Sequence, residues 1–391
     1  MRSCFLGVLI ARHALAVGAL LASVAPSDGS DRGPEPRRDP FKQPFASNSI
    51  WNTPIGDAAR YEHARLEGGD ASGMTVDEDL IVLRPDAPSL TVRYNDAGWD
   101  RDKSRCTTDG EVLFHAPIPD DFLVGPHNWD GSTPNSGLAV LMEDGRTIRQ
   151  TQPFARCRPD RDATSMFLVD DVDLYGDGVS GSHGGSGLSV IGGSLRLGEL
   201  RPGGAAIRHA LKVNVYAARN LYYDDKTRGY RWPALRADSY AKGNYGTQRS
   251  ATPVAACRMG ALLALPADVE IDDLGLETEP AIAIAHALQD YGAYVVDDTA
   301  WDVFAIACEW SPDGRFIEQF QSDWGFPFIT ADRQHPWSKD MRRLFYSLHV
   351  VDNNVPSTPG GGGSPRQPPA PPLAAPALSA RPGSGPQASG P

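Results

Sequence analysis

Short apolar runs separated by turn-forming residues dominate the middle of this chain, and they predict β-strands. Two of these runs, LIVL at 80–83 and LTVRY at 90–94, are bounded by Pro, Asp and Gly. The segment 137–154 (GLAVLMEDGRTIRQTQPF) predicts a hairpin, because Asp144-Gly145 supplies the positive φ angle of a tight turn. The pattern therefore indicates several short strands with close connections.

A second hairpin is expected over 195–217, with Pro202-Gly203-Gly204 at its tip. Its second arm alternates apolar and polar residues, and His209 falls on the apolar face. A long strand or pair of strands is expected at 294–310 (YVVDDTAWDVFAIACEW).

Helical periodicity is confined to two segments near the C-terminal end. The segment 279–291 predicts a helix that begins after Thr278 and ends at Gly292, and a shorter helix is expected at 338–347. Because strands and helices do not alternate, a parallel α/β fold is not expected. We predict a β-rich fold of antiparallel sheets, sandwich or jelly-roll-like, with one or two peripheral helices.

The two ends of the chain differ in composition from its middle. The first 25 residues resemble a signal peptide, with Arg2 and Arg12 before an apolar run and small residues at the cleavage position; an uncleaved anchor is the alternative. A flexible linker is expected at 26–40 and a globular domain, possibly two subdomains, at 41–355. Half of residues 356–391 are Pro or Gly, which predicts a disordered tail.

Charge narrows the choice of partners. The 391 residues include 37 Lys and Arg against 49 Asp and Glu, a net charge of −12. An acidic chain without a Lys/Arg cluster is not expected to bind nucleic acid, nor to bind a membrane once the signal peptide is removed. We expect a secreted or periplasmic protein.

Four cysteines remain once a signal peptide containing Cys4 is removed, which predicts two disulfides in an oxidising compartment. Three pairings are possible; we favour Cys106 with Cys157 and Cys257 with Cys308, because each closes a loop within one half of the chain. A zinc site is the alternative, but the cysteines lack the short paired spacing of zinc ligands.

The densest chemical signal is the glycine-rich segment 176–193, which contains a single imidazole, His183. So many glycines imply a backbone that turns sharply or is closely approached by another group. His183 is our first candidate catalytic residue, because imidazole exchanges protons near neutral pH. A turn histidine bonded to the backbone is the alternative. Because Ser186 lies close to His183 in the sequence, a serine hydrolase is a further alternative.

Carboxylates with close spacing lie directly upstream of this segment. Asp171, Asp173 and Asp177 occur at a spacing that lets oxygen ligands converge on a hard cation, so Ca²⁺ is possible there. The closing Glu and flanking helices of an EF-hand are missing, and a solvated acidic turn is the alternative. No other cofactor is required by the sequence.

Further candidate residues lie downstream. Glu199 and Asp298 are candidate acid and base, with Arg208 and His209 as catalytic partners. The segment 221–246 is aromatic yet polar, which is typical of a surface loop that stacks sugar rings. The candidate substrate-binding residues in it are Tyr222, Tyr223, Trp232 and Tyr240.

Three segments, SNSIWNTPIG at 48–57, GSHGGSGLSVIGG at 181–193 and LQDYGAYVVDDTAWDVFAI at 288–306, together resemble a group of exported bacterial proteins without an assigned activity. The resemblance implies a bacterial secreted protein and carries no catalytic residue.

These observations favour a secreted enzyme acting on a polysaccharide or cell-wall glycan in a cleft around His183. It would be a lyase, with a Tyr or His base and an Arg beside a uronate, or a glycoside hydrolase with two carboxylates. The alternative is a non-catalytic carbohydrate-binding or cell-surface module.

Overall fold

The computed structural model describes residues 37–69, 73–125, 135–249 and 251–374. The expected signal peptide, most of the expected linker and the end of the expected tail lie outside these residues. Within the described ranges, no helix is both long enough and apolar enough to cross a membrane.

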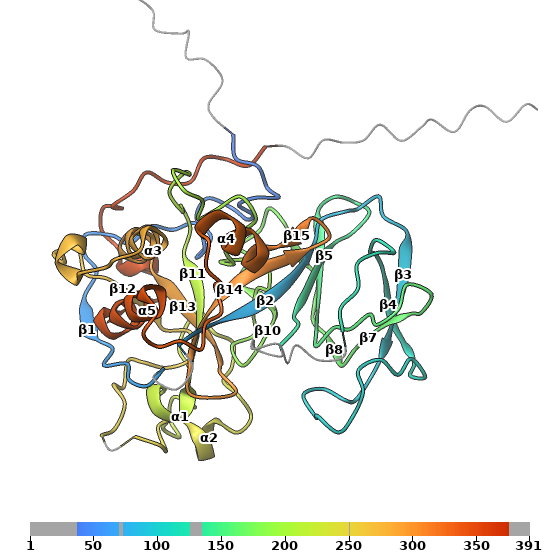
Figure 1. Ribbon diagram of the computed structural model, residues 1–391, viewed down its shortest axis with the longest axis horizontal. Coiled ribbons are helices and arrows are strands. Elements are labelled where there is room, and N and C mark those ends of the chain that lie inside the picture. The colour runs from blue at the N-terminus through green and yellow to red at the C-terminus, as the bar shows by residue number, and fades with distance from the viewer. Residues whose placement is uncertain (1–36, 70–72, 126–134, 250, 375–391) are drawn as a thin grey trace, which may run out of the picture. The chain divides into compact units, whose positions relative to one another are not determined.

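A large mixed sheet forms the centre of the fold (Figure 1). Three neighbouring pairs in it, β11 with β13, β14 with β2, and β2 with β5, are parallel, and the other pairs are antiparallel. In order across the sheet the strands are β1 (Tyr61–His63), β16 (His349–Val351), β12 (Leu262–Ala264), β13 (Ala293–Asp298), β11 (Leu211–Val215), β14 (Phe304–Ser311), β2 (Met74–Val82), β5 (Leu138–Leu141), β6 (Thr147–Gln152) and β8 (Phe167–Leu168), with β15 (Gly314–Arg315) beside β14 and β9 (Val172–Asp173) beside β6.

A smaller sheet packs on the β2 and β5 end of the large one. It consists of β4 (Val112–Pro117), β3 (Ser89–Tyr94) and β7 (Ala163–Ser165). Leu80 and Val140 of the large sheet share an apolar cluster with Val92 and Phe114 of the small one. The predicted β-rich, sandwich-like class is therefore confirmed, although the sheets are mixed rather than antiparallel.

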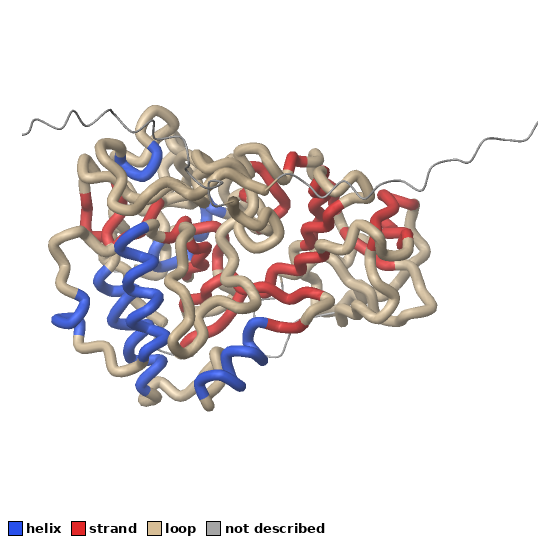
Figure 2. The backbone as a smooth tube through the Cα atoms, turned by 90° about the horizontal axis from the view of Figure 1, so that it is seen from above, coloured by secondary structure: helices blue, strands red, loops and turns tan. Residues whose placement is uncertain are grey.

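Helices cover one face of the large sheet. Ile284 of α3 and Leu344 of α5 join the apolar cluster that contains Val213 and Val295 of the sheet, and Figure 2 shows the two longest helices side by side. The described residues contain five α-helices, where one or two were predicted: α1 (Ala217–Asn220), α2 (Ala241–Asn244), α3 (Glu279–Asp290), α4 (Phe316–Trp324) and α5 (Pro336–Ser347), with short 3₁₀ turns at Ile271–Leu274 and Pro359–Gly361.

The opposite face of the sheet is covered by loops. Trp51 and Ile191 belong to the apolar cluster on this side, together with Tyr294 and Val296 of β13. Successive residues of β13 therefore bury their side chains on alternate faces, as strand geometry requires. Burial on both faces explains why the central strands are almost continuously apolar.

Of the predicted local elements, one hairpin and one helix are confirmed and a second hairpin is wrong. The hairpin at 137–154 is confirmed as β5 and β6, with Gly145 at φ 67° in the turn. The helix predicted at 279–291 is α3, and Gly292 follows it at φ 74°. The hairpin predicted at 195–217 is wrong, because only its second arm is a strand, and that strand pairs in parallel with β13.

One of the two predicted disulfides is present. Cys106 and Cys157 are bonded, with Cα atoms 5.7 Å apart. Cys257 and Cys308 are buried free thiols, so that predicted pairing is wrong. Cys257 lies shortly before β12, and β12 is three strand positions from β14, which carries Cys308. Three spacings of roughly 4.8 Å exceed the reach of a disulfide.

The fold continues past residue 355, where the tail was expected to begin. Backbone hydrogen bonds join Gly56 to Gly360 (3.0 Å), Arg366 to Ile55 (2.9 Å) and Arg38 to Pro372 (2.9 Å). The first part of the expected tail and the end of the expected linker thus lie against each other.

Candidate active site

A cavity of about 810 Å³ lies where β13 ends and where the chain turns after β10 (Ser180–His183). Its walls come from segments far apart in the sequence, including the loop that contains Asp238 and the loop that contains Trp99. Three carboxylates and three aromatic rings line it: Asp238, Asp297 and Asp298, and Trp99, Phe167 and Tyr240.

The glycines after His183 make room for two of these carboxylates. A Cβ atom on Gly184 would collide with the Asp297 carboxylate, and a Cβ on Gly185 would lie 2.7 Å from Asp238 Oδ1. The backbone N–H of Gly185 donates to Asp297 Oδ1 at 2.9 Å. The sequence analysis expected a close approach at this turn, and the approaching groups are acidic side chains.

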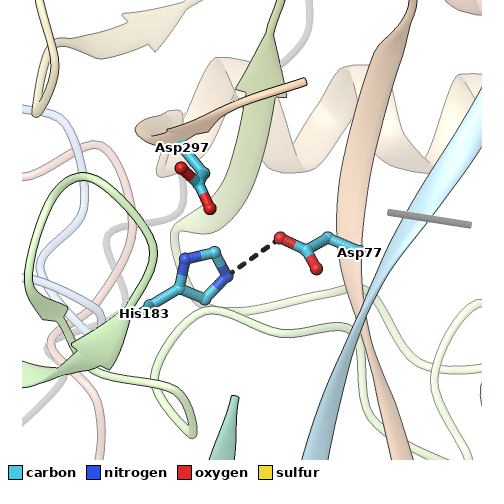
Figure 3. Close-up of side chains that lie close together, drawn as sticks. All are labelled: Asp77, His183 and Asp297. Atoms are coloured by element: carbon cyan, nitrogen blue, oxygen red, sulfur yellow. Dashed lines mark ion pairs between the residues drawn. The ribbon is translucent and has the colours of Figure 1, made fainter. Parts of the chain in front are cut away.

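His183 lies beneath the cavity. The residue is 1 % exposed, and its Nε2 atom is 3.2 Å from Asp77 Oδ2 and 3.4 Å from Asp79 Oδ1. Figure 3 shows the carboxylates of Asp77 and Asp297 next to each other at the ring, with Asp77 beside Nε2. The sequence predicted that the ring opens onto a cleft. The ring is instead buried, and Asp297, which lies close to it, lines the cavity.

Two central strands carry the aspartates next to His183 and the partners of those aspartates. β2 carries Asp77 and Asp79, and β11 carries Lys212 and Asn214. Lys212 Nζ lies 2.8 Å from Asp79 Oδ2, which also accepts a hydrogen bond from Ser194 Oγ at 2.7 Å. Lys212 is fully buried and donates further to the backbone carbonyls of residues 189 and 190.

Amide side chains connect the carboxylates. Asn214 Nδ2 donates to Asp77 Oδ2 at 2.6 Å. Asn135 Nδ2 donates to Asp77 Oδ2 at 2.9 Å and to Asp297 Oδ2 at 2.8 Å, so one amide bridges the two carboxylates that flank His183. The oxygens next to the imidazole are thus held by several N–H donors.

Burial raises the proton affinity of the carboxylates at the cavity. Burial raises the pKa of Asp298 to about 7, although the hydrogen bond from the Ala217 N–H lowers it. The pKa of Asp297 is raised well above its ordinary value by burial and by the negative charges of Asp238 and Asp77. Burial also raises the pKa of Asp238.

Two tyrosines hold the outer carboxylates in place. Tyr245 donates its hydroxyl to Asp238 Oδ2 at 2.6 Å, and Tyr240 donates to Asp298 Oδ2 at 3.2 Å. Burial raises the pKa of both hydroxyls, so both remain donors at neutral pH.

Several residues predicted from the sequence lie in a different network. His209 Nε2 is 3.1 Å from Glu199 Oε1, and Arg208 hydrogen-bonds to Tyr291. None of these residues lines the cavity or contacts His183 in the described chain. The candidate catalytic roles of Glu199, Arg208 and His209 are therefore not supported, whereas Asp298 lies in the cavity wall.

The predicted calcium ligands do not converge. Asp171 pairs with Arg149 at 2.7 Å and Asp173 with Arg146 at 2.6 Å. Asp177 accepts a hydrogen bond from the backbone N–H of residue 179. Each carboxylate thus has its own partner, and the structure does not support a calcium site here.

Of the four predicted aromatic ligands, Tyr240 lines the cavity. Tyr222 hydrogen-bonds to Asp224, Tyr223 donates to Asp225, and Trp232 packs against the apolar cluster on the loop-covered face.

Sequence reasoning missed Asp77, Asp79, Lys212 and Asn214. The signal that was available is the presence of charged and amide residues within two otherwise apolar strands, DED at 77–79 in β2 and Lys212 with Asn214 in β11, because such side chains require buried partners. Asp238 and Asn135 lie in loops and carried no such signal.

The arrangement supports two kinds of chemistry. Carboxylates on a cavity wall with raised proton affinity can donate and accept protons. A buried imidazole between carboxylates can hold a cation, and Asp77, His183 and Asp297 place one ligand atom each within 4.8 Å of one another.

No known protein family, curated protein or solved structure matches this chain. The fold and the site define a β-rich protein with an acidic cavity next to a buried histidine.

Proposed function

We propose that the protein is an exported polysaccharide-cleaving enzyme, a glycoside hydrolase that acts in the cavity above His183. The observation that supports this most is the meeting of three carboxylates, Asp238, Asp297 and Asp298, in the wall of one cavity of about 810 Å³. Glycoside hydrolysis needs two carboxyl groups, one as acid and one as base or nucleophile. The volume falls in the range of small-molecule binding sites.

Aromatic rings at the cavity suit a sugar ligand. Trp99 is 41 % exposed and Tyr240 is 51 % exposed, although both are large and could be buried. Trp99 lies against Phe167, with ring centroids 6.3 Å apart. Exposed rings beside carboxylates offer a stacking surface for a pyranose and hydrogen bonds for its hydroxyls.

The charge of the cavity favours a hydrolase over a lyase. A lyase must neutralise the carboxylate of a uronate, and here three carboxylates line the cavity together with Arg101 and Arg236. Carboxylates in the wall repel a uronate when they are ionised, whereas a neutral glycan is not repelled. We therefore assign a neutral polysaccharide as the substrate class.

The outer two carboxylates are the proposed acid and base. Asp238 and Asp298 are both partly exposed, and each is oriented by a tyrosine hydroxyl. Asp297 is 5 % exposed and faces His183, so it is less available to substrate.

Export is supported by the disulfide between Cys106 and Cys157; Cys106 lies in the same connection between β3 and β4 as Trp99. Disulfides persist mainly in oxidising compartments.

The test is incubation of the purified protein with a panel of neutral and uronate-containing polysaccharides. Reducing ends and the ultraviolet absorbance of unsaturated uronides are followed together. We expect new reducing ends from a neutral glycan without the absorbance. In Asp238→Asn and Asp298→Asn, turnover should fall by roughly 10²- to 10⁴-fold.

The matched control is Asp225→Asn, which removes an exposed carboxylate that is paired with Lys242 and does not line the cavity. It should retain full turnover. Ultraviolet absorbance from a uronide would instead show a lyase. Retention of a glycan without any cleavage would show the carbohydrate-binding module, which the exposed Trp99 and Tyr240 would also suit.

A further inference from the structure

A buried histidine nitrogen lacks a partner next to the cavity. His183 is 1 % exposed, and its Nδ1 atom has no hydrogen-bond partner among the described residues. A buried polar atom left without a partner costs roughly 1–3 kcal/mol, so such atoms in a native fold call for an explanation. In Figure 3 the carboxylates of Asp77 and Asp297 both point toward the ring.

The Asp297 carboxylate next to the ring has no cationic partner among the described residues. Asp297 is held by N–H donors from uncharged groups, namely the backbone of Gly185 and Asp298 and the side chain of Asn135. The nearby buried ammonium group of Lys212 is paired with Asp79 instead. None of these contacts brings a positive charge to Asp297, so a bound cation would stabilise its ionised form.

The distances suit a metal ion. One ligand atom each from Asp77, His183 and Asp297 lies within 4.8 Å of the other two. Ligand atoms bound to one zinc ion at about 2.0–2.2 Å lie roughly 3.3–3.6 Å apart in tetrahedral geometry. The terminal torsion of an Asp side chain is soft, so rotation of the two carboxylates can close the remaining difference of roughly 1.2–1.5 Å.

We propose that Asp77, His183 and Asp297 together bind one divalent transition-metal ion, Zn²⁺ or Mn²⁺, beneath the cavity. One imidazole and two carboxylates form a mixed nitrogen and oxygen ligand set, which suits these ions. Ca²⁺ is disfavoured because it takes six to eight oxygen ligands.

The site borders the cavity through one of its ligands. Asp297 belongs both to the ligand set and to the cavity wall, so the three protein ligands lie next to the space where substrate would bind. Metal sites with three protein ligands and an open position are typical of catalytic rather than structural metals. The metal proposal stands on the geometry of these residues and does not depend on the proposed hydrolase activity.

The test uses the full chain without its signal peptide, stripped with a chelator and then titrated with Zn²⁺, Mn²⁺ or Ca²⁺ by calorimetry. We expect one Zn²⁺ or Mn²⁺ ion per chain and much weaker Ca²⁺ binding. Co²⁺ should give the visible absorption of a nitrogen- and oxygen-ligated ion. A wild-type chain that binds none of these transition metals would overturn the proposal.

Variants locate the ion. The three substitutions Asp77→Asn, His183→Asn and Asp297→Asn should each lower the metal affinity at least tenfold. Loss of a residue that only supports a metal ligand already lowers the affinity by about 10- to 100-fold. Asp171→Asn, which removes a carboxylate of the exposed pair with Arg149, should bind like wild type. Unchanged affinity in all three site variants would place the metal elsewhere and contradict the assignment.

Folding is checked by circular dichroism and by the melting temperature. If a variant unfolds, the Co²⁺ spectrum of the wild-type protein still decides the question. Metal binding without glycan cleavage would refute the proposed function alone, and glycan cleavage by a chain that binds no metal would refute the metal site alone.

Discussion

His183 and His209 are both buried and both lie beside carboxylates, yet their surroundings differ in charge balance. His209 Nε2 is 3.1 Å from Glu199 Oε1. The other oxygen of Glu199, Oε2, accepts a hydrogen bond from the backbone N–H of Arg196 at 2.8 Å. The Arg196 side chain pairs in turn with Glu309 at 2.8 Å. Positive and negative groups thus alternate around His209.

Around His183 the carboxylates predominate. Asp77 and Asp79 approach its Nε2 atom, and a carboxylate oxygen of Asp297 also lies close to the ring. The nearby buried cation, Lys212, is paired with Asp79. The comparison suggests that a buried histidine with balanced charges stabilises the fold, while one with surplus negative charge beside a cavity serves a ligand.

The matched substitutions His183→Asn and His209→Asn give the largest expected difference. The first should lower glycan turnover by at least about 100-fold and remove metal binding, because it deletes a ligand beneath the cavity. The second should leave both properties within about twofold of wild type, since His209 does not contact the cavity residues. Turnover and calorimetric metal binding are measured on the same preparations.

Equal losses of turnover in the two variants would break the distinction and would point to a general effect on folding. The melting temperature of each variant provides the control.

Local features of the fold could be predicted from the sequence. The β5–β6 hairpin follows from Asp144-Gly145, and α3 follows from its apolar stripe and from Gly292. Both elements depend on residues within a short stretch of chain. The close approach at the turn after His183 was also predictable, because glycine at consecutive positions implies that another group needs the space.

The composition of the site could not be predicted in the same way. Asp77 and Asp297 are separated by more than 200 residues, and they come together because β11 and β14 join β13 to β2 in one sheet. Strand order is set by packing across the whole sheet, which a local pattern does not contain. The same long-range order separates Cys257 from Cys308.

Lys212→Met offers the next largest effect and tests how the acidic cluster is stabilised. Lys212 and Asp79 are both buried, so the substitution leaves Asp79 without its ion-pair partner. Breaking a buried pair in this way destabilises a protein by about 3–5 kcal/mol. The free energy of unfolding is measured by urea denaturation.

The matched control is Arg201→Met, which breaks the exposed pair with Asp323 and should cost less than about 1 kcal/mol. The double variant Asp79→Asn with Lys212→Met should recover part of the loss, because it removes the uncompensated charge. A loss below 1 kcal/mol in the single variant would show that the ammonium group does not stabilise the cluster.

His209 predicts a pH dependence of stability. Burial lowers its pKa, but the charge and hydrogen bond of Glu199 outweigh this and raise the pKa of His209 above its ordinary value. A raised pKa means that the contribution to stability is full below the unfolded-state pKa, about 6.5, and is lost as the pH rises through the folded-state value.

The stability difference between wild type and His209→Gln should therefore be larger at pH 5.5 than at pH 8.5. At pH 5.5 it should be on the order of 1–3 kcal/mol, as for a hydrogen bond between charged groups. Urea denaturation at both pH values measures it. A difference that does not change with pH would mean that His209 is not charged in the folded protein.

The smallest expected effect concerns the acidic turn at Asp171, Asp173 and Asp177, which the sequence suggested as a calcium site. Asp171 and Asp173 are paired with arginines at the surface, where such pairs contribute about 0–1 kcal/mol. Asp171→Asn should therefore change the free energy of unfolding by less than about 1 kcal/mol. It should also leave the melting temperature in Ca²⁺ equal to that in a Ca²⁺-specific chelator. A Ca²⁺-dependent rise in melting temperature that Asp171→Asn abolishes would show that this second acidic region binds a cation after all, and charge balance alone would then no longer distinguish it from the cluster around His183.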